Sequence, residues 1–221
     1  MNASTIIIIL CSTIINCNIN VINNSNINQQ SGLGDDSCSY VAELSIFSYY
    51  SQYYISSDID IGGHAFITLT NYRKEPICFG KMILNNDETV SLGNYGNISS
   101  HKGTIYNLDS YKVNQLGEMK GRVSLSMGLN LDQLIKLNLF INGHDSWSIT
   151  YNCSSFAQEA WNLVSDDKVT AHEDLNYLVY KPEILVNSIM KYSYYKTDKY
   201  IHNNIKIGYY NNNEFISISE N

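Results

Sequence analysis

Apolar and polar residues alternate over 64–71, a segment that is also rich in β-branched side chains. A period of two predicts a strand, and the polar stretch 71–75 that follows predicts a turn. We expect 77–84 to return as the antiparallel partner of that strand. The same reasoning predicts further strands at 89–92 and 122–126, so the first half of the domain is predominantly β.

Helical spacing begins at Asn130, where apolar residues recur every three to four positions over 131–142. Asn130 can cap this helix, Gln133 can complete a capping box, and Gly143 can end it. An apolar stripe at helical spacing over 154–164 predicts a second helix, which places Cys153 at its N-terminus.

The remaining segments contain one predicted helix, one short extended piece and one hairpin. Pro182 near the first turn predicts a helix over 182–192, and 147–151 is expected to be a short extended piece leading to Cys153. An Asn-rich turn predicts a hairpin within 205–218. The apolar positions between 40 and 54 fit a helix and a strand equally well, so the pattern leaves that segment open.

The chain begins with an apolar run over 6–15 that has the length of a signal-peptide core and is too short to span a bilayer comfortably. A buried strand or a retained anchor is the alternative. We expect a signal peptide over 1–17, a disordered polar leader over 18–37, and one domain over 38–221. No later stretch has the length of a membrane helix, so secretion without stable membrane insertion is predicted.

Charge narrows the choice of partner. The 221 residues carry a formal net charge of −7, and Arg73 and Arg122 are the two arginines. An acidic chain with so few arginines does not suit a phosphate backbone, so nucleic acid is not expected to bind. No pair of His, Cys, Asp or Glu residues has a convincing metal-ligand spacing, and neither a metal nor another cofactor is predicted.

The chain has five cysteines, of which Cys11 and Cys17 fall in the predicted signal segment. Cys38, Cys78 and Cys153 would remain, and an odd number leaves at least one thiol without an internal disulfide partner. We expect Cys38 and Cys78 to pair or to be buried, because neither has the polar or cationic company that would lower a thiol pKa.

Cys153 is a candidate nucleophile because of its position. The amide N–H groups and the dipole of a helix N-terminus favour a thiolate, and the same N–H groups can stabilise an oxyanion. The alternative is that Cys153 is a small buried core residue, which is common for cysteine.

Sequence blocks strengthen the first interpretation. The segment Tyr151-Asn-Cys-Ser-Ser-Phe156 resembles the Cys-bearing helix start of circularly permuted NlpC/P60-like families, which include lecithin:retinol acyltransferase-like proteins and PPPDE-type peptidases. The segment 63–70, Gly-His-Ala-Phe-Ile-Thr-Leu-Thr, is similar to their His-bearing strand. Blocks at 91–96, 101–109 and 142–147 resemble a group of bacterial secreted proteins, so the resemblance covers most of residues 60–210.

The resemblance implies an α+β, permuted papain-like domain in which the Cys helix packs on an antiparallel sheet and His64 faces Cys153. A third polar residue, which orients the histidine, is then expected on the next strand near Lys81, but a charged lysine cannot accept a proton from imidazole. We therefore predict His101 in this role, with His144 as a second choice. Either histidine could instead be a solvated loop residue.

These residues predict a secreted cysteine peptidase or amidase that acts through a Cys153–His64 dyad and an acyl-enzyme. The expected partner is a peptide, peptidoglycan or lipid-ester substrate. An acyltransferase or phospholipase of the same fold is the alternative function, and a degenerate binding or effector module is the third.

Overall fold

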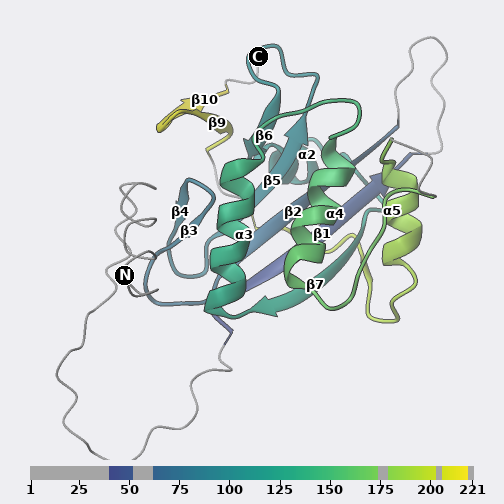
Figure 1. Ribbon diagram of the computed structural model, residues 1–221, viewed down its shortest axis with the longest axis horizontal. Helices are drawn as coiled ribbons and strands as arrows, with labels where there is room; N and C mark the ends of the chain where they lie inside the picture. Colours follow the sequence, from purple (N-terminus) through teal and green to yellow (C-terminus); the bar gives the residue numbers. More distant parts are fainter. Residues whose placement is uncertain (1–39, 52–61, 174–178, 203–205, 219–221) are drawn as a thin grey trace, which may run out of the picture.

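The computed structural model describes residues 40–51, 62–173, 179–202 and 206–218. It is an α+β structure whose centre is an eight-stranded antiparallel sheet in the order β10-β9-β6-β5-β2-β1-β7-β8 (Figure 1). The predicted signal segment 1–17, the leader 18–37 and Cys38 lie outside the described residues. No helix of the described ranges has the length and apolar character to cross a bilayer.

The strands of the main sheet are β1 (Ala42–Tyr50), β2 (Gly63–Asn71), β5 (Thr89–Tyr95), β6 (Gly103–Tyr106), β7 (Val123–Leu129), β8 (Lys196–Thr197), β9 (Gly208–Asn211) and β10 (Glu214–Ser217). A separate two-stranded sheet consists of β3 (Ile77–Phe79) and β4 (Met82–Leu84). The helices are α2 (Leu108–Asn114), α3 (Leu131–Gly143), α4 (Cys153–Val164) and α5 (Pro182–Ile189).

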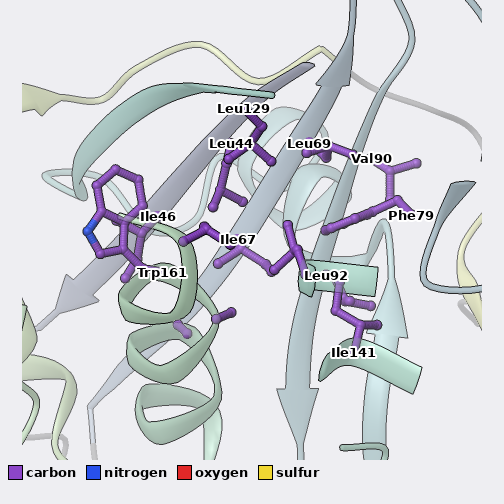
Figure 2. Packing of buried hydrophobic residues seen from close by; sticks show 14 of the residues in the cluster. Leu44, Ile46, Ile67, Leu69, Phe79, Val90, Leu92, Leu129, Ile141 and Trp161 are labelled. Atoms are coloured by element: carbon purple, nitrogen blue, oxygen red, sulfur yellow. The ribbon is translucent and has the colours of Figure 1, made fainter. Parts of the chain in front are cut away.

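Helices cover both faces of the sheet, and this arrangement places the site. The main core joins one face of the central strands to α3, α4 and α5, with Trp161 of α4 packed among Ile46 and Ile67 (Figure 2). On the opposite face, Leu108 and Val113 of α2 contribute to two smaller apolar clusters. Residues of β2 can therefore contact α4 from one side and α2 from the other.

Burial on both faces explains why the segment 40–54 gave no clear pattern. In β1 the consecutive residues Leu44 to Ser48 are all buried, serines included, so the strand lacks the alternation of buried and exposed residues of a half-exposed strand. Strand β1 pairs with β2 along its whole length, with Ala42 opposite Asn71 and Tyr50 opposite Gly63. The sheet thereby fixes the position of His64, which lies opposite Tyr49.

Several predicted elements are confirmed. Helix α3 has the expected capping box between Asn130 and Gln133. Helix α4 begins at Cys153, and α5 begins with Pro182 at its N-terminus. The C-terminal hairpin forms from β9 and β10, and the strand predicted over 122–126 is β7.

Two expectations about connectivity are wrong. The segment 77–84 does not pair with β2. It folds on itself as the β3–β4 hairpin, and β5 takes the place beside β2. The segment 147–151 is a hydrogen-bonded turn, in which the Ser148 and Tyr151 backbone groups bond to each other, and it is not extended.

Candidate functional site

The nucleophile candidate lies at the first position of α4. Asn152 is the N-cap, and its side-chain oxygen accepts hydrogen bonds from the backbone N–H groups of Ser154 and Ser155, at 2.9 and 3.3 Å. Such a cap contributes about 1 kcal/mol to helix stability. The Asn152 side-chain amide also donates to the Tyr180 carbonyl at 2.9 Å, which ties the helix start to the neighbouring loop.

This cap leaves one N–H of the first turn for chemistry. The amides of Ser154 and Ser155 bond to the cap side chain, and that of Phe156 bonds to the Asn152 carbonyl. The Cys153 amide has no such partner among the described residues. It lies next to the sulfur at the positive end of the helix, where it can donate to an oxyanion.

The Cys153 thiol contacts β2 near the end of the hydrogen-bonded pairing between β2 and β5. The last paired residues are Phe66 and Gly93, and the backbone N–H of Ala65 donates to the Cys153 sulfur. Strand alternation directs His64 to the same face as Phe66, whereas α4 packs on the other face. The thiol therefore contacts His64 at the end of the β2–β5 ladder, between the two faces.

Cys153 and His64 form a charged pair. Burial raises the pKa of the Cys153 thiol. The charge and hydrogen bond of His64 outweigh this effect, so the pKa of Cys153 is lower than that of an ordinary thiol. Burial also lowers the pKa of His64, but the charges of Cys153 and Asp109 raise it to about 10. Both shifts favour the thiolate–imidazolium form of the pair over the neutral form.

The carboxylate that contacts His64 belongs to Asp109, which lies in the first turn of α2 and has a fully buried side chain. Its Oδ1 atom is 2.8 Å from Nε2 of His64. The ring N–H is not aligned well enough for a regular hydrogen bond, so charge attraction dominates the contact. With Nε2 directed to Asp109, Nδ1 is the ring nitrogen that remains for Cys153.

Hydrogen bonds to β5 hold the start of α2. The backbone N–H of Asn107 donates to the Ser91 carbonyl at 2.9 Å, and the Asn107 side-chain oxygen accepts from the Ser91 N–H at 3.2 Å. The Ser110 N–H donates to the Ser91 hydroxyl at 3.1 Å. These hydrogen bonds involve the residues on both sides of Asp109 and fix the position of Asp109 relative to the sheet.

Gly93 provides the space for the His64–Asp109 pair. A Cβ atom at this position would lie 2.6 Å from Oδ2 of Asp109 and 2.8 Å from Nε2 of His64. Both distances are shorter than real Cβ contacts; Asp109 is fully buried and the His64 side chain is 14% exposed. Glycine is therefore required on β5 for a close approach of side chains.

We expect Gly93→Ala to separate His64 from Asp109 and to slow alkylation of Cys153 by about 10-fold or more, as for other losses of precise placement. Iodoacetamide labelling of the folded variant measures this rate. Gly143→Ala is the matched control, because a Cβ atom at Gly143 meets no atom within 4 Å. Equal rates for Gly93→Ala and the unmodified protein would contradict this role of Gly93.

The prediction for His101 is wrong, because this histidine does not lie beside His64. It lies just before β6, where its Nε2 is 3.0 Å from Oδ1 of Asp145 and its ring stacks on Tyr209 at 4.3 Å. The same Asp145 oxygen accepts from the Thr104 backbone N–H and hydroxyl, both at 2.8 Å. His101 thus anchors the loop that precedes α4.

Lys81 and His144 also lie elsewhere. Lys81 is in the β3–β4 turn, and its ammonium group donates to the Asn212 carbonyl. His144 ends α3, stacks on Phe140 and contacts its carbonyl at 2.7 Å. The expectation that the third residue lies near Lys81 failed because the β3–β4 hairpin is not part of the main sheet.

Asp109 lies at a junction between a strand and a helix. The four residues 103–106 form a short strand, Asn107 then adopts a left-handed backbone conformation with φ of 64°, and Asp109 follows in the first turn of a helix. A carboxylate in a first helical turn is common, however, because it complements the helix dipole. Only the fold, which places Asp109 beside His64, distinguishes it from such a residue.

The other cysteine of the described ranges differs from Cys153. Cys78 is disulfide-bonded, whereas Cys153 is free and partly exposed. The predicted pairing of Cys78 with Cys38 falls on a residue outside the described ranges. Across the parts that the structure describes, no group of three His, Cys, Asp or Glu residues is arranged to hold a metal ion.

Comparison with known proteins gives no match to a protein-family model, a curated protein or a solved structure.

Proposed function

We propose that the protein is a secreted cysteine hydrolase with a permuted papain-like domain that cleaves an amide or peptide bond. One observation carries the proposal: His64 contacts both a free thiol at a helix N-terminus and a buried carboxylate. In enzymes that transfer acyl groups, a nucleophile contacts a base, and the base contacts a group that orients it. Cys153, His64 and Asp109 are in contact in this order. The order of His64 before Cys153 and the packing of α4 on an antiparallel sheet support the permuted papain-like assignment.

In the proposed reaction the Cys153 thiolate attacks the substrate carbonyl carbon, and a C–S bond forms as the carbonyl electrons move to oxygen. The Cys153 amide stabilises that oxyanion. The oxyanion then reforms the carbonyl, the C–N bond breaks, and the leaving amine takes the proton of the His64 imidazolium. Asp109 keeps the imidazole in place and stabilises its charged form.

Deacylation reverses these roles. Neutral His64 accepts a proton from water, and the hydroxide attacks the thioester carbonyl. The C–S bond breaks, which releases a carboxylic acid and restores the thiolate with its imidazolium partner. No metal or other cofactor takes part in these steps.

Secretion is proposed from the apolar run 6–15, which lies outside the described residues. A secreted amidase would meet peptides and peptidoglycan, and a net charge of −7 fits neutral or basic substrates better than strongly acidic ones.

A substrate screen tests the proposal. The protein is incubated with peptides, peptidoglycan fragments and phospholipids, and the products are identified by mass spectrometry. We expect a free amine and a carboxylic acid from an amide substrate, and no product with Cys153→Ala. Release of a fatty acid, or its transfer to another acceptor, would contradict an amidase and favour the phospholipase or acyltransferase.

A further inference from the structure

Tyr95 of β5 contacts both partners of the His64–Asp109 pair. Its hydroxyl donates a hydrogen bond of 2.5 Å to Oδ1 of Asp109, the oxygen that also lies 2.8 Å from His64. Its ring lies against the His64 ring, with centroids 4.5 Å apart. The Tyr95 side chain is 5% exposed, so water competes little for either contact.

The Asp109 carboxylate depends on these contacts for its orientation. Its second oxygen, Oδ2, is buried and has no hydrogen-bond partner among the described residues. The Tyr95 hydroxyl is therefore the one regular side-chain hydrogen bond to Asp109 in the described part of the chain. A buried carboxylate with so few donors can turn about its side-chain torsion once that bond is lost.

The chemistry of Tyr95 suits a permanent donor. Burial and the adjacent Asp109 charge raise the pKa of the Tyr95 hydroxyl well above its ordinary value, so it remains protonated wherever Cys153 and His64 are active. The neutral hydroxyl stabilises the Asp109 charge without cancelling it.

We propose that Tyr95 is a positioning residue that fixes the Asp109 carboxylate, and through it the His64 ring, relative to Cys153. The proposal rests on the Cys153–His64–Asp109 arrangement of the proposed function. It adds Tyr95 to that arrangement. Strand β5 then has two roles, because Gly93 leaves space for the His64–Asp109 pair and Tyr95 orients the Asp109 carboxylate.

Tyr95→Phe tests this proposal, because it removes the hydroxyl and keeps the ring against His64. Iodoacetamide alkylation of Cys153 is followed as a function of pH and needs no known substrate. The loss of one hydrogen bond to a charged group is expected to slow alkylation at neutral pH by about 10-fold. The alkylation midpoint is expected to move up, because His64 stabilises the thiolate less well.

A double-mutant cycle separates positioning from a general structural effect. If Tyr95 acts through Asp109, the double variant Tyr95→Phe/Asp109→Asn is alkylated as fast as Asp109→Asn alone. Tyr106→Phe is the matched control: it removes another buried tyrosine hydroxyl, one that accepts from the Lys81 backbone N–H at 3.1 Å. This control is expected to keep the rate of the unmodified protein.

Each outcome is decisive. All variants are compared at a temperature where melting curves show them folded. A Tyr95→Phe rate equal to that of the unmodified protein, with Asp109→Asn slow, would overturn the Tyr95 proposal alone, and so would additive losses in the double variant. If Asp109→Asn also matches the unmodified protein, the proposed triad is wrong and the role of Tyr95 falls with it.

Discussion

Cys153→Ala and His64→Ala are each expected to abolish turnover, with a loss of about 100,000-fold or more, because nucleophile and base act as one unit. The double variant should be no worse than either single one. Cys153→Ala should fold normally, since alanine at a helix start is well tolerated and the Asn152 cap remains. Turnover of the best substrate from the screen and thermal melting measure both effects.

The two variants differ in one further respect, the reactivity of the thiol. In the unmodified protein the alkylation midpoint should lie below the ordinary thiol pKa of about 8.5, because His64 lowers the pKa of Cys153. In His64→Ala only burial and the weaker hydrogen bonds remain, and burial raises a thiol pKa. The midpoint should therefore move up to or above about 8.5.

A control variant shows whether the change in alkylation is specific to His64. His202 is exposed, and His202→Ala is expected to leave turnover and alkylation unchanged. If His64→Ala has the same alkylation profile and turnover as the unmodified protein, the two residues are not functional partners. The proposed hydrolase mechanism then fails.

Asp109→Asn is expected to lower turnover by about 100- to 10,000-fold, the range for losing the carboxylate that orients a catalytic histidine. The amide has nearly the size of the carboxylate, so the effect arises from charge. Asp109 raises the pKa of His64 against the opposing effect of burial. Its removal lowers that pKa, and the imidazolium is then lost at a lower pH than in the unmodified protein.

The pH profile of turnover shows this shift directly. The proposed mechanism needs a thiolate and an imidazolium, so the activity of the unmodified protein should extend from the lowered pKa of Cys153 toward the value of about 10 for His64. In Asp109→Asn the upper limit should move to lower pH. Asp132→Asn, which changes an exposed carboxylate of α3, should keep the original profile. An unchanged profile in Asp109→Asn would contradict the assigned role.

The positions of the candidate nucleophile and the candidate base could be predicted from sequence because each depends on one local pattern. Cys153 begins an apolar helical stripe, and His64 begins an alternating strand. Their contact follows once α4 packs on the sheet near the start of β2. Local spacing and the sequence resemblance were sufficient to predict that Cys153 and His64 lie together.

The third residue depends on topology, which spacing does not encode. Asp109 comes from a seven-residue helix on the face opposite α4, and it reaches His64 because β6 brings the chain to that edge of β5. The prediction assumed that 77–84 pairs with β2, whereas β5 does. His101, in contrast, contacts Asp145 and Tyr209.

Detection of an acyl-enzyme on Cys153 tests the central claim most directly. The protein is mixed with p-nitrophenyl acetate, nitrophenolate release is followed in the first turnover, and the quenched protein is digested and analysed by mass spectrometry. The account predicts a burst of about one nitrophenolate per protein molecule, with an acetyl group on the peptide that contains Cys153. The burst should be absent in Cys153→Ala and strongly slowed in His64→Ala. Acetylation at another residue, or an equal burst in Cys153→Ala, would contradict the assignment of Cys153 as the nucleophile.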